Sequence, residues 1–126
     1  MTRGADPARH LLKMADRDLR AFEVLAASDV DPAVAGFHAQ QAVEKFLKAV
    51  LIRHGIEFRR THDLAELMDL LKESGKLSPP HADRLDELNP YAVEFRYGLV
   101  EPKGLDRAQV ERMLMDVRAW AEKQVG

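Results

Sequence analysis

Apolar residues recur along this chain at intervals of three and four, the spacing of one face of an α-helix. In the first such stretch, about residues 7–27, they fall on a single face. They are Leu12, Ala15, Leu19, Phe22 and Ala26. Asp6-Pro7 precedes the stretch and supplies an N-cap carboxylate followed by proline at the first helical position. The pattern therefore predicts a long amphipathic helix.

The second stretch, about residues 32–54, follows another such pair, Asp31-Pro32, and has the richest apolar content. One half of its circumference holds Ala35, Ala39, Ala42, Val43, Phe46, Leu47, Ala49 and Val50. The other half holds Gln40, Gln41, Glu44, Lys45 and Lys48, interleaved with Phe37, Leu51 and Ile52. A helix that is apolar on one side and mixed on the other is typical of a central helix whose second side is also covered. We expect it to be the most buried helix, with Phe46 and Val50 in the core.

A third helix is expected to start near Asp63, which with Glu66 three residues later forms the pattern of a capping box. From residue 78 to 98 the periodicity is interrupted. Ser78-Pro79 predicts one short helical turn and Asn89-Pro90 predicts another that runs to Tyr97.

The last long helix is expected over about residues 106–125, with its apolar face formed by Val110, Met113, Leu114, Val117, Trp120 and Ala121. Gly55, Gly75 and Gly98 each follow an apolar stretch, where a left-handed residue commonly ends a helix.

No alternating strand pattern of useful length occurs in the sequence, which indicates an all-α protein. The elements predict an up-and-down helical bundle of about four to five helices, three of them long and one or two short. A length of 126 residues suits one domain that covers residues 1–126.

The composition narrows the possible functions. Lys and Arg total 19 against 21 for Asp and Glu, so the chain is not a globally basic nucleic-acid binder, although a local basic face is possible. Disulfides, thiol catalysis and cysteine-based zinc sites are excluded because cysteine is absent. The sequence shows neither a signal peptide nor an apolar run long enough to cross a membrane, which predicts a cytoplasmic protein without a membrane partner.

Metal binding is not expected. The five histidines form neither a His-x3-His pair nor a Glu-x-x-His motif; they are His10, His38, His54, His62 and His81. A glycine-rich phosphate loop is also absent, and the sequence indicates no cofactor.

Three segments in order resemble the HEPN family (higher eukaryotes and prokaryotes nucleotide-binding domain). Residues 37–49, FHAQQAVEKFLKA, are similar to the family pattern A-Q-Q-A-x-E-K-x-L-K-A. Residues 60–64, RTHDL, are similar to its T-H-D-L, and Arg96-Tyr97 to its Arg-Tyr element, although Gly98 stands where proline is commoner. The resemblance spans nearly the whole chain, from the first helix to the last.

The resemblance implies a site between helices that binds the phosphate groups of a nucleotide or RNA. The candidate residues are Gln41, Lys45, Lys48, His62, Asp63, Arg96 and Tyr97. Arg96 is the best single anion-binding candidate. The resemblance also implies a homodimer and a minimal nucleotidyltransferase as partner, in a toxin–antitoxin-like pair. Phe37, Leu51 and Ile52, which interrupt the polar half of the second helix, favour an interface.

Each of these motifs has a purely structural alternative. Gln40, Glu44 and Lys48 are spaced as a solvated helix face with a Glu44–Lys48 ion pair. In the second motif Asp63 can cap a helix while His62 packs as a hydrophobic staple. Arg96 beside Tyr97 can be a buried structural pair.

Ribonucleases of the HEPN superfamily carry an Arg-x4-6-His motif near the start of the last long helix. Counted from Arg96, the permitted histidine positions hold Glu101, Pro102 and Lys103. The chain's own match, Arg3 to His10, lies at the N-terminus, where the family does not place the motif.

We therefore expect a non-catalytic nucleotide- or RNA-binding domain with no catalytic residues. One alternative is a ribonuclease toxin with a rearranged site that uses His62 and Arg96. Another is a structural dimerisation or adapter module.

Overall fold

The computed structural model describes residues 5–29, 32–92 and 106–126, and these residues form helices but no strands. Three long helices are α1 (Pro7–Ala26), α2 (Pro32–Arg53) and α4 (Arg107–Val125). Two short ones are α3 (Leu64–Gly75) and the 3-10 helix η1 (Leu85–Tyr91). Within these described residues the predicted all-α fold is confirmed, with three long helices and two short ones.

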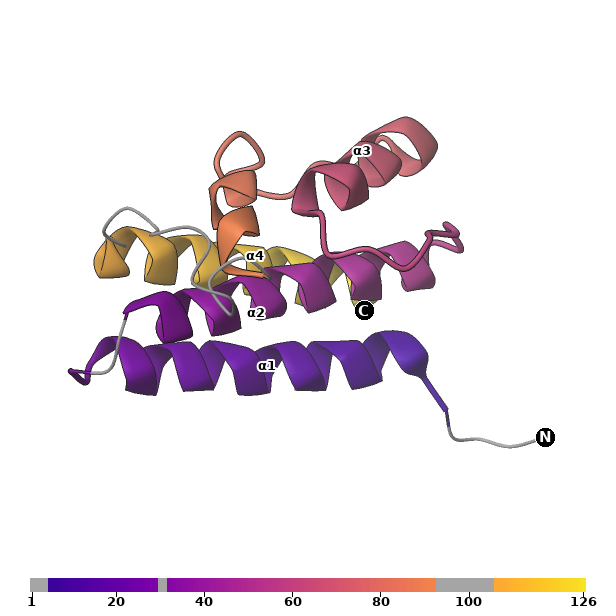
Figure 1. The fold of residues 1–126 in the computed structure, drawn as a ribbon. Coiled ribbons are helices and arrows are strands. Elements are labelled where there is room, and N and C mark those ends of the chain that lie inside the picture. Colours follow the sequence, from indigo (N-terminus) through magenta and orange to yellow (C-terminus); the bar gives the residue numbers. More distant parts are fainter. Residues whose placement is uncertain (1–4, 30–31, 93–105) are drawn as a thin grey trace.

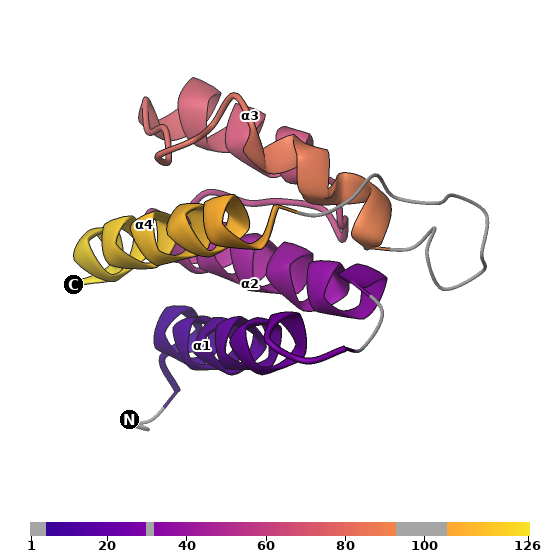
Figure 2. The same ribbon diagram turned by 90° about the vertical axis from the view of Figure 1, so that its left-hand side faces the viewer.

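The helices form layers around α2 (Figures 1 and 2). α1 lies on one side of α2 and runs antiparallel to it, and α4 runs in the same direction as α2. α3 and η1 form a further layer on the side of α2 away from α1. After α2 the chain passes through α3 and η1, and η1 ends beside the N-terminal part of α2. α4 begins at this same end of the bundle (Figure 1).

The central position of α2 is confirmed, because it contacts α1, α3, α4 and η1. Phe46 and Val50 are fully buried, as expected. Leu51 is also fully buried within this one chain, although the sequence suggested it for an interface between chains. Its side of α2 is instead covered by other parts of the same bundle.

The helix starts follow the sequence closely. The carboxylates of Asp6 and Asp106 each accept a hydrogen bond of 3.2 Å from the backbone N–H three residues later, and Asp63 accepts one of 3.0 Å from Ala65. These bonds satisfy backbone donors that a helix start leaves unpaired. The predicted N-caps Asp6 and Asp63 are therefore confirmed, and Asp106 caps α4 in the same way, whereas the N-cap predicted at Asp31 lies outside the described residues.

The expectation for Gly75 is wrong, whereas Gly55 does adopt the left-handed conformation, with φ of 68°. Gly75 is the last residue of α3, and the left-handed residue is Lys76, with φ of 54°. A β-carbon on Gly75 would lie only 3.2 and 3.3 Å from atoms of Leu77 and Ile56. This glycine therefore permits close packing rather than a special backbone conformation.

In the described part of residues 78–98, the first expected turn and the start of the second form one continuous helix, η1, which contains Pro90. Asn89 does not begin a new helix, because its side chain is bonded to the start of α3 instead. Tyr91 ends η1 on α2, where its ring covers Gly36. The remainder of the second expected turn, including Tyr97, lies outside the described residues.

Within the described part of the chain, none of the helices combines the length and apolar character needed to cross a membrane.

Candidate functional site

Glu44, near the middle of α2, is the centre of a buried polar cluster. Its side chain is only 5% exposed and accepts hydrogen bonds from Gln40 Nε2 at 3.2 Å and Lys48 Nζ at 3.0 Å. His62 Nδ1 lies 2.9 Å from Glu44 Oε1, the oxygen that also accepts from Gln40, whereas Lys48 is bound to Oε2. The expected Glu44–Lys48 pair is therefore present, but the solvated helix face is wrong because Gln40 and Glu44 are buried.

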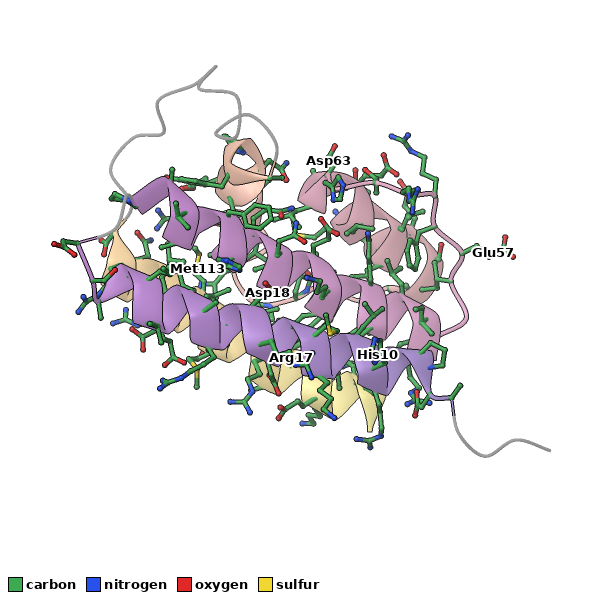
Figure 3. The ribbon with its side chains drawn as sticks, turned by 60° about the horizontal axis from the view of Figure 1, so that its bottom comes forward. His10, Arg17, Asp18, Glu57, Asp63 and Met113 are labelled. Atoms are coloured by element: carbon green, nitrogen blue, oxygen red, sulfur yellow. The ribbon has the colours of Figure 1, made fainter. Side chains whose placement is uncertain are left out.

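A second carboxylate, Asp18 on α1, organises the neighbouring part of α2 (Figure 3). Asp18 is 13% exposed; its Oδ1 lies 2.9 Å from His38 Nδ1, and its Oδ2 accepts a hydrogen bond of 2.5 Å from Lys45 Nζ. The two oxygens thus hold one imidazole and one ammonium group that lie two helical turns apart on α2. Much of the charge of Lys45 is neutralised inside the protein by this pair.

Two glutamines join the clusters into one network. Lys45 Nζ donates to Gln41 Oε1 at 3.4 Å, and Gln41 Nε2 donates to Gln40 Oε1 at 2.8 Å. Gln40 Nε2 donates to Glu44 and also, at 2.9 Å, to the backbone carbonyl of His62. A continuous chain of polar contacts therefore runs from α1 along α2 to the segment before α3.

The segment before α3 is held by a separate set of bonds. Asp63 N–H donates to Thr61 Oγ1 at 3.1 Å, and Asn89 Nδ2 donates to Asp63 Oδ1 at 3.0 Å. Glu66 does not complete the capping box, because its carboxylate accepts two hydrogen bonds from Arg59 at 2.6 and 2.9 Å. Asp63 therefore caps α3, which is the structural alternative considered for this motif. Because Asp63 directly follows His62 in the chain, this cap also positions the backbone of His62.

His62 is not a packed staple, since its side chain is 56% exposed. With Nδ1 held by Glu44, its Nε2 is the ring nitrogen left for a ligand. Lys48 Nζ lies 5.8 Å from the centre of the Phe58 ring, which is a cation–π distance. Arg60, two residues before His62, is exposed and forms no ion pair with another described residue. This edge of the bundle thus presents imidazole, ammonium and guanidinium groups, which together suit an anionic ligand.

The structure brings together four of the seven candidate residues: Gln41, Lys45, Lys48 and His62. Asp63 is adjacent but faces α3 and η1, and Arg96 and Tyr97 lie outside the described residues. None of the described residues form a group of three or more side chains suited to hold a metal ion.

Sequence reasoning did not select Asp18 or His38, although a signal for Asp18 exists. A row of half-buried residues follows α1 beside its fully apolar face, with 3-4-3-4 spacing: Leu11, Met14, Asp18, Ala21 and Leu25. An aspartate in an otherwise apolar row requires a buried partner, which α2 supplies.

Comparison with known proteins identifies the fold. The family model of the HEPN domain matches residues 8–123. A protein of Methanocaldococcus jannaschii named "Putative toxin MJ1304" is 45% identical over 53 residues. The match spans 42% of this chain and 34% of that protein. The crystal structure of ST0689, an archaeal HEPN homologue, superposes with a TM-score of 0.66 and 23% identity, over 97% of this chain and all of that one.

Proposed function

This chain belongs to the HEPN domain family, and we propose that it binds the phosphate groups of RNA or a nucleotide at the edge formed by α2 and the segment before α3. Lys48 and His62 form the centre of this site, and Arg60 and Arg96 supply further positive charge. Gln41 and Lys45 hold the α2 side of the site in place. The resemblance of one segment to a protein named as a toxin supports a toxin-like role.

The observation that carries the proposal is the arrangement around Glu44. A single buried carboxylate orients both the Lys48 ammonium and the exposed His62 ring. Fixing these groups before binding lowers the entropy cost of ordering them around a ligand. When His62 is protonated, the two cations exceed the one anion, so the cluster carries a net positive charge that attracts phosphate.

We propose binding without catalysis because the chain departs from the ribonuclease motif. Glu101, Pro102 and Lys103 occupy the three positions at which a histidine would follow Arg96. Proton transfer at physiological pH is a task for which histidine is the usual residue. Proline has no proton to transfer, and the ordinary pKa values of glutamate and lysine lie further from neutral pH than that of histidine.

A second candidate function, RNA cleavage at a rearranged site, is favoured by one contact. The carboxylate of Glu44 holds Nδ1 of His62, which fixes the ring and leaves Nε2 available for proton transfer. A His62→Ala variant should then lose cleavage of a short RNA. Cleavage that is absent from the wild type, or unchanged in the variant, excludes this candidate.

The proposal includes a homodimer in the cytoplasm, paired with a minimal nucleotidyltransferase. Phe37 and Ile52 are both half-buried on α2, and these two side chains offer an apolar contribution to a two-fold interface. Sedimentation at micromolar concentration should show a species of about twice the chain mass of 14.2 kDa. A species of the single-chain mass would argue against the dimer.

Titration calorimetry with ATP, GTP and a short single-stranded RNA tests the binding site. Lys48→Ala or His62→Ala should weaken binding about tenfold or more, the effect of losing one charge-assisted contact. Lys123 lies in the last turn of α4 and is not part of the proposed site. Lys123→Ala removes one positive charge there and should leave the affinity for these ligands unchanged. No heat from any ligand would favour the adapter module instead.

A further inference from the structure

A groove on the outer layer of the bundle lies between α3 and the chain that follows it. Its volume is about 720 Å³. One face of α3 forms one wall, where Ala65 and Met68 are spaced by three residues, and Leu77 and Ala82 complete the apolar lining. Its other wall is the segment from Ser78 to Asp86. The groove is distinct from the Glu44 network, and none of the candidate phosphate-binding residues that the structure describes lines it.

The rim of the groove is acidic. Asp69 on α3 faces the groove together with Asp83 and Asp86 of the opposite wall. Lys72 and Lys76 also line it, near the C-terminal end of α3. Across residues 63–88 the chain carries seven Asp and Glu residues against three Lys and Arg, although the whole chain is nearly neutral. The part of the rim formed by Asp83 and Asp86 would attract a cationic segment, whereas the end with Lys72 and Lys76 would attract an anionic group.

The backbone of the groove's second wall is held in an unusual conformation. Lys76 and His81 are the described non-glycine residues with positive φ, at 54° and 61°, and both lie within the connection between α3 and η1. His81 Nε2 lies 2.8 Å from Asp116 Oδ2, which ties this wall to α4. This contact with α4 supports the wall, so that the groove is already formed before a partner binds.

We propose that this groove docks a basic amphipathic segment of a partner protein. Its apolar side chains would enter between Met68 and Leu77, and its Lys or Arg residues would pair with Asp83 and Asp86. A carboxylate at one end of the segment would meet Lys72 and Lys76. The apolar floor contributes burial, and the charged rim sets orientation and partner choice.

A defined pair of probes tests the inference. The first is a synthetic amphipathic peptide of about three helical turns made of lysine and leucine, and the second has glutamate in place of every lysine. Methionine residues are labelled with 13C at the methyl group, so that Met68 reports on the groove and the exposed Met115 on α4 serves as an internal reference. We expect the lysine peptide to shift the Met68 signal and leave Met115 unchanged, and the glutamate peptide to shift neither.

A charge reversal completes the test. Asp83→Lys with Asp86→Lys should weaken binding of the lysine peptide at least tenfold, because like charges would then face each other at the rim. Glu23→Lys with Asp29→Lys makes the same change at the C-terminal end of α1, in the layer opposite α3, and should leave that affinity unchanged (Figure 1). Any of three results would overturn the inference: an equal loss of lysine-peptide affinity in both double variants, equal binding of both peptides, or a shift of the Met115 signal as large as that of Met68.

The outcome is separable from that of the phosphate site. RNA titrations of the same double variants measure the other surface, and RNA binding should not fall on reversing Asp83 and Asp86. A protein that binds no RNA but docks the lysine peptide would contradict the proposed function alone.

Discussion

His62 reaches Glu44 from outside α2, with its Nδ1 2.9 Å from a carboxylate oxygen that is almost fully buried. An exposed ring is thus fixed by a partner that belongs to the core. The same carboxylate also holds Lys48. The orientation of the His62 ring and of the Lys48 ammonium therefore depends on one residue of the central helix.

Removal of that residue should reduce stability as well as binding. Glu44→Ala removes the carboxylate that Gln40 and His62 share and leaves the Lys48 ammonium without its ion-pair partner, which should lower the free energy of unfolding by about 1–3 kcal/mol. Urea denaturation measures the change. Glu66→Ala removes the half-buried partner of the exposed Arg59 and should cost less than about 1 kcal/mol. A Glu44→Ala protein as stable as Glu66→Ala would show that the network contributes little.

Phe46 tests the position of α2 in the core. Its side chain is fully buried, so Phe46→Ala should lower the free energy of unfolding by about 3–5 kcal/mol through lost burial and the cavity that remains. Val24, which is 53% exposed on α1, provides the control, because Val24→Ala should change stability by less than about 0.5 kcal/mol. A loss below about 1 kcal/mol at Phe46 would contradict the central role of α2.

The close approach of Gly36 and Tyr91 gives a third prediction. A β-carbon on Gly36 would lie 2.3 Å from Cδ1 of the tyrosine ring, so Gly36→Ala must displace η1. We expect a destabilisation of about 1–3 kcal/mol, which is typical of overpacking. A double-mutant cycle with Tyr91→Ala checks the cause, because the alanine at position 36 should cost little once the ring is absent. Additive losses would place the strain elsewhere.

Much of the fold follows from local sequence rules. The apolar spacing of α1, α2 and α4 and their flanking residues predicted these helices within one or two residues. The region after α3 was less predictable, because its conformation depends on distant partners. Asn89 bonds to the start of α3 and Tyr91 packs on Gly36, contacts that join residues far apart in the sequence.

The candidate site shows the same division. The motif around Lys48 and His62 correctly grouped residues from α2 and from the segment before α3. Sequence spacing could not show that Glu44 is buried or that Lys45 pairs with Asp18, because both results require the packing of α1 against α2. The structure thus separates the buried Glu44, which holds the network together, from the exposed ring of His62.

The burial of Tyr91 predicts a dependence of stability on alkaline pH. Burial raises the pKa of Tyr91 above its ordinary value of 10.0. The folded protein therefore retains the phenol proton that the unfolded chain releases, and this contribution to stability is fully present below pH 10. It is lost as the pH rises from 10 through the higher pKa of the folded state. Urea denaturation should show a smaller loss in this range for Tyr91→Phe than for the wild type; identical slopes would contradict the assignment.

The comparison of Arg96 with Lys45 tests which cations face the ligand. Lys45 is bound to Asp18 and Gln41, so its positive charge is already paired with a carboxylate within the protein. The planar guanidinium of arginine suits phosphate oxygens, and Arg96 belongs to the Arg-Tyr element of the family resemblance. Arg96→Ala should weaken binding of RNA or nucleotide about tenfold to a hundredfold, the effect of losing one charge-assisted contact worth about 1.5–3 kcal/mol.

Lys45→Ala should instead lower the free energy of unfolding and change affinity less, because it leaves the largely buried Asp18 with His38 as its remaining partner. Titration calorimetry against ATP, GTP and a short RNA, repeated at two salt concentrations, measures both variants. Affinity should fall as salt rises, since part of the attraction between cations and phosphate is screened. Equal affinities of wild type and Arg96→Ala, or a larger loss of affinity in Lys45→Ala, would place the phosphate contacts on α2 rather than on Arg96.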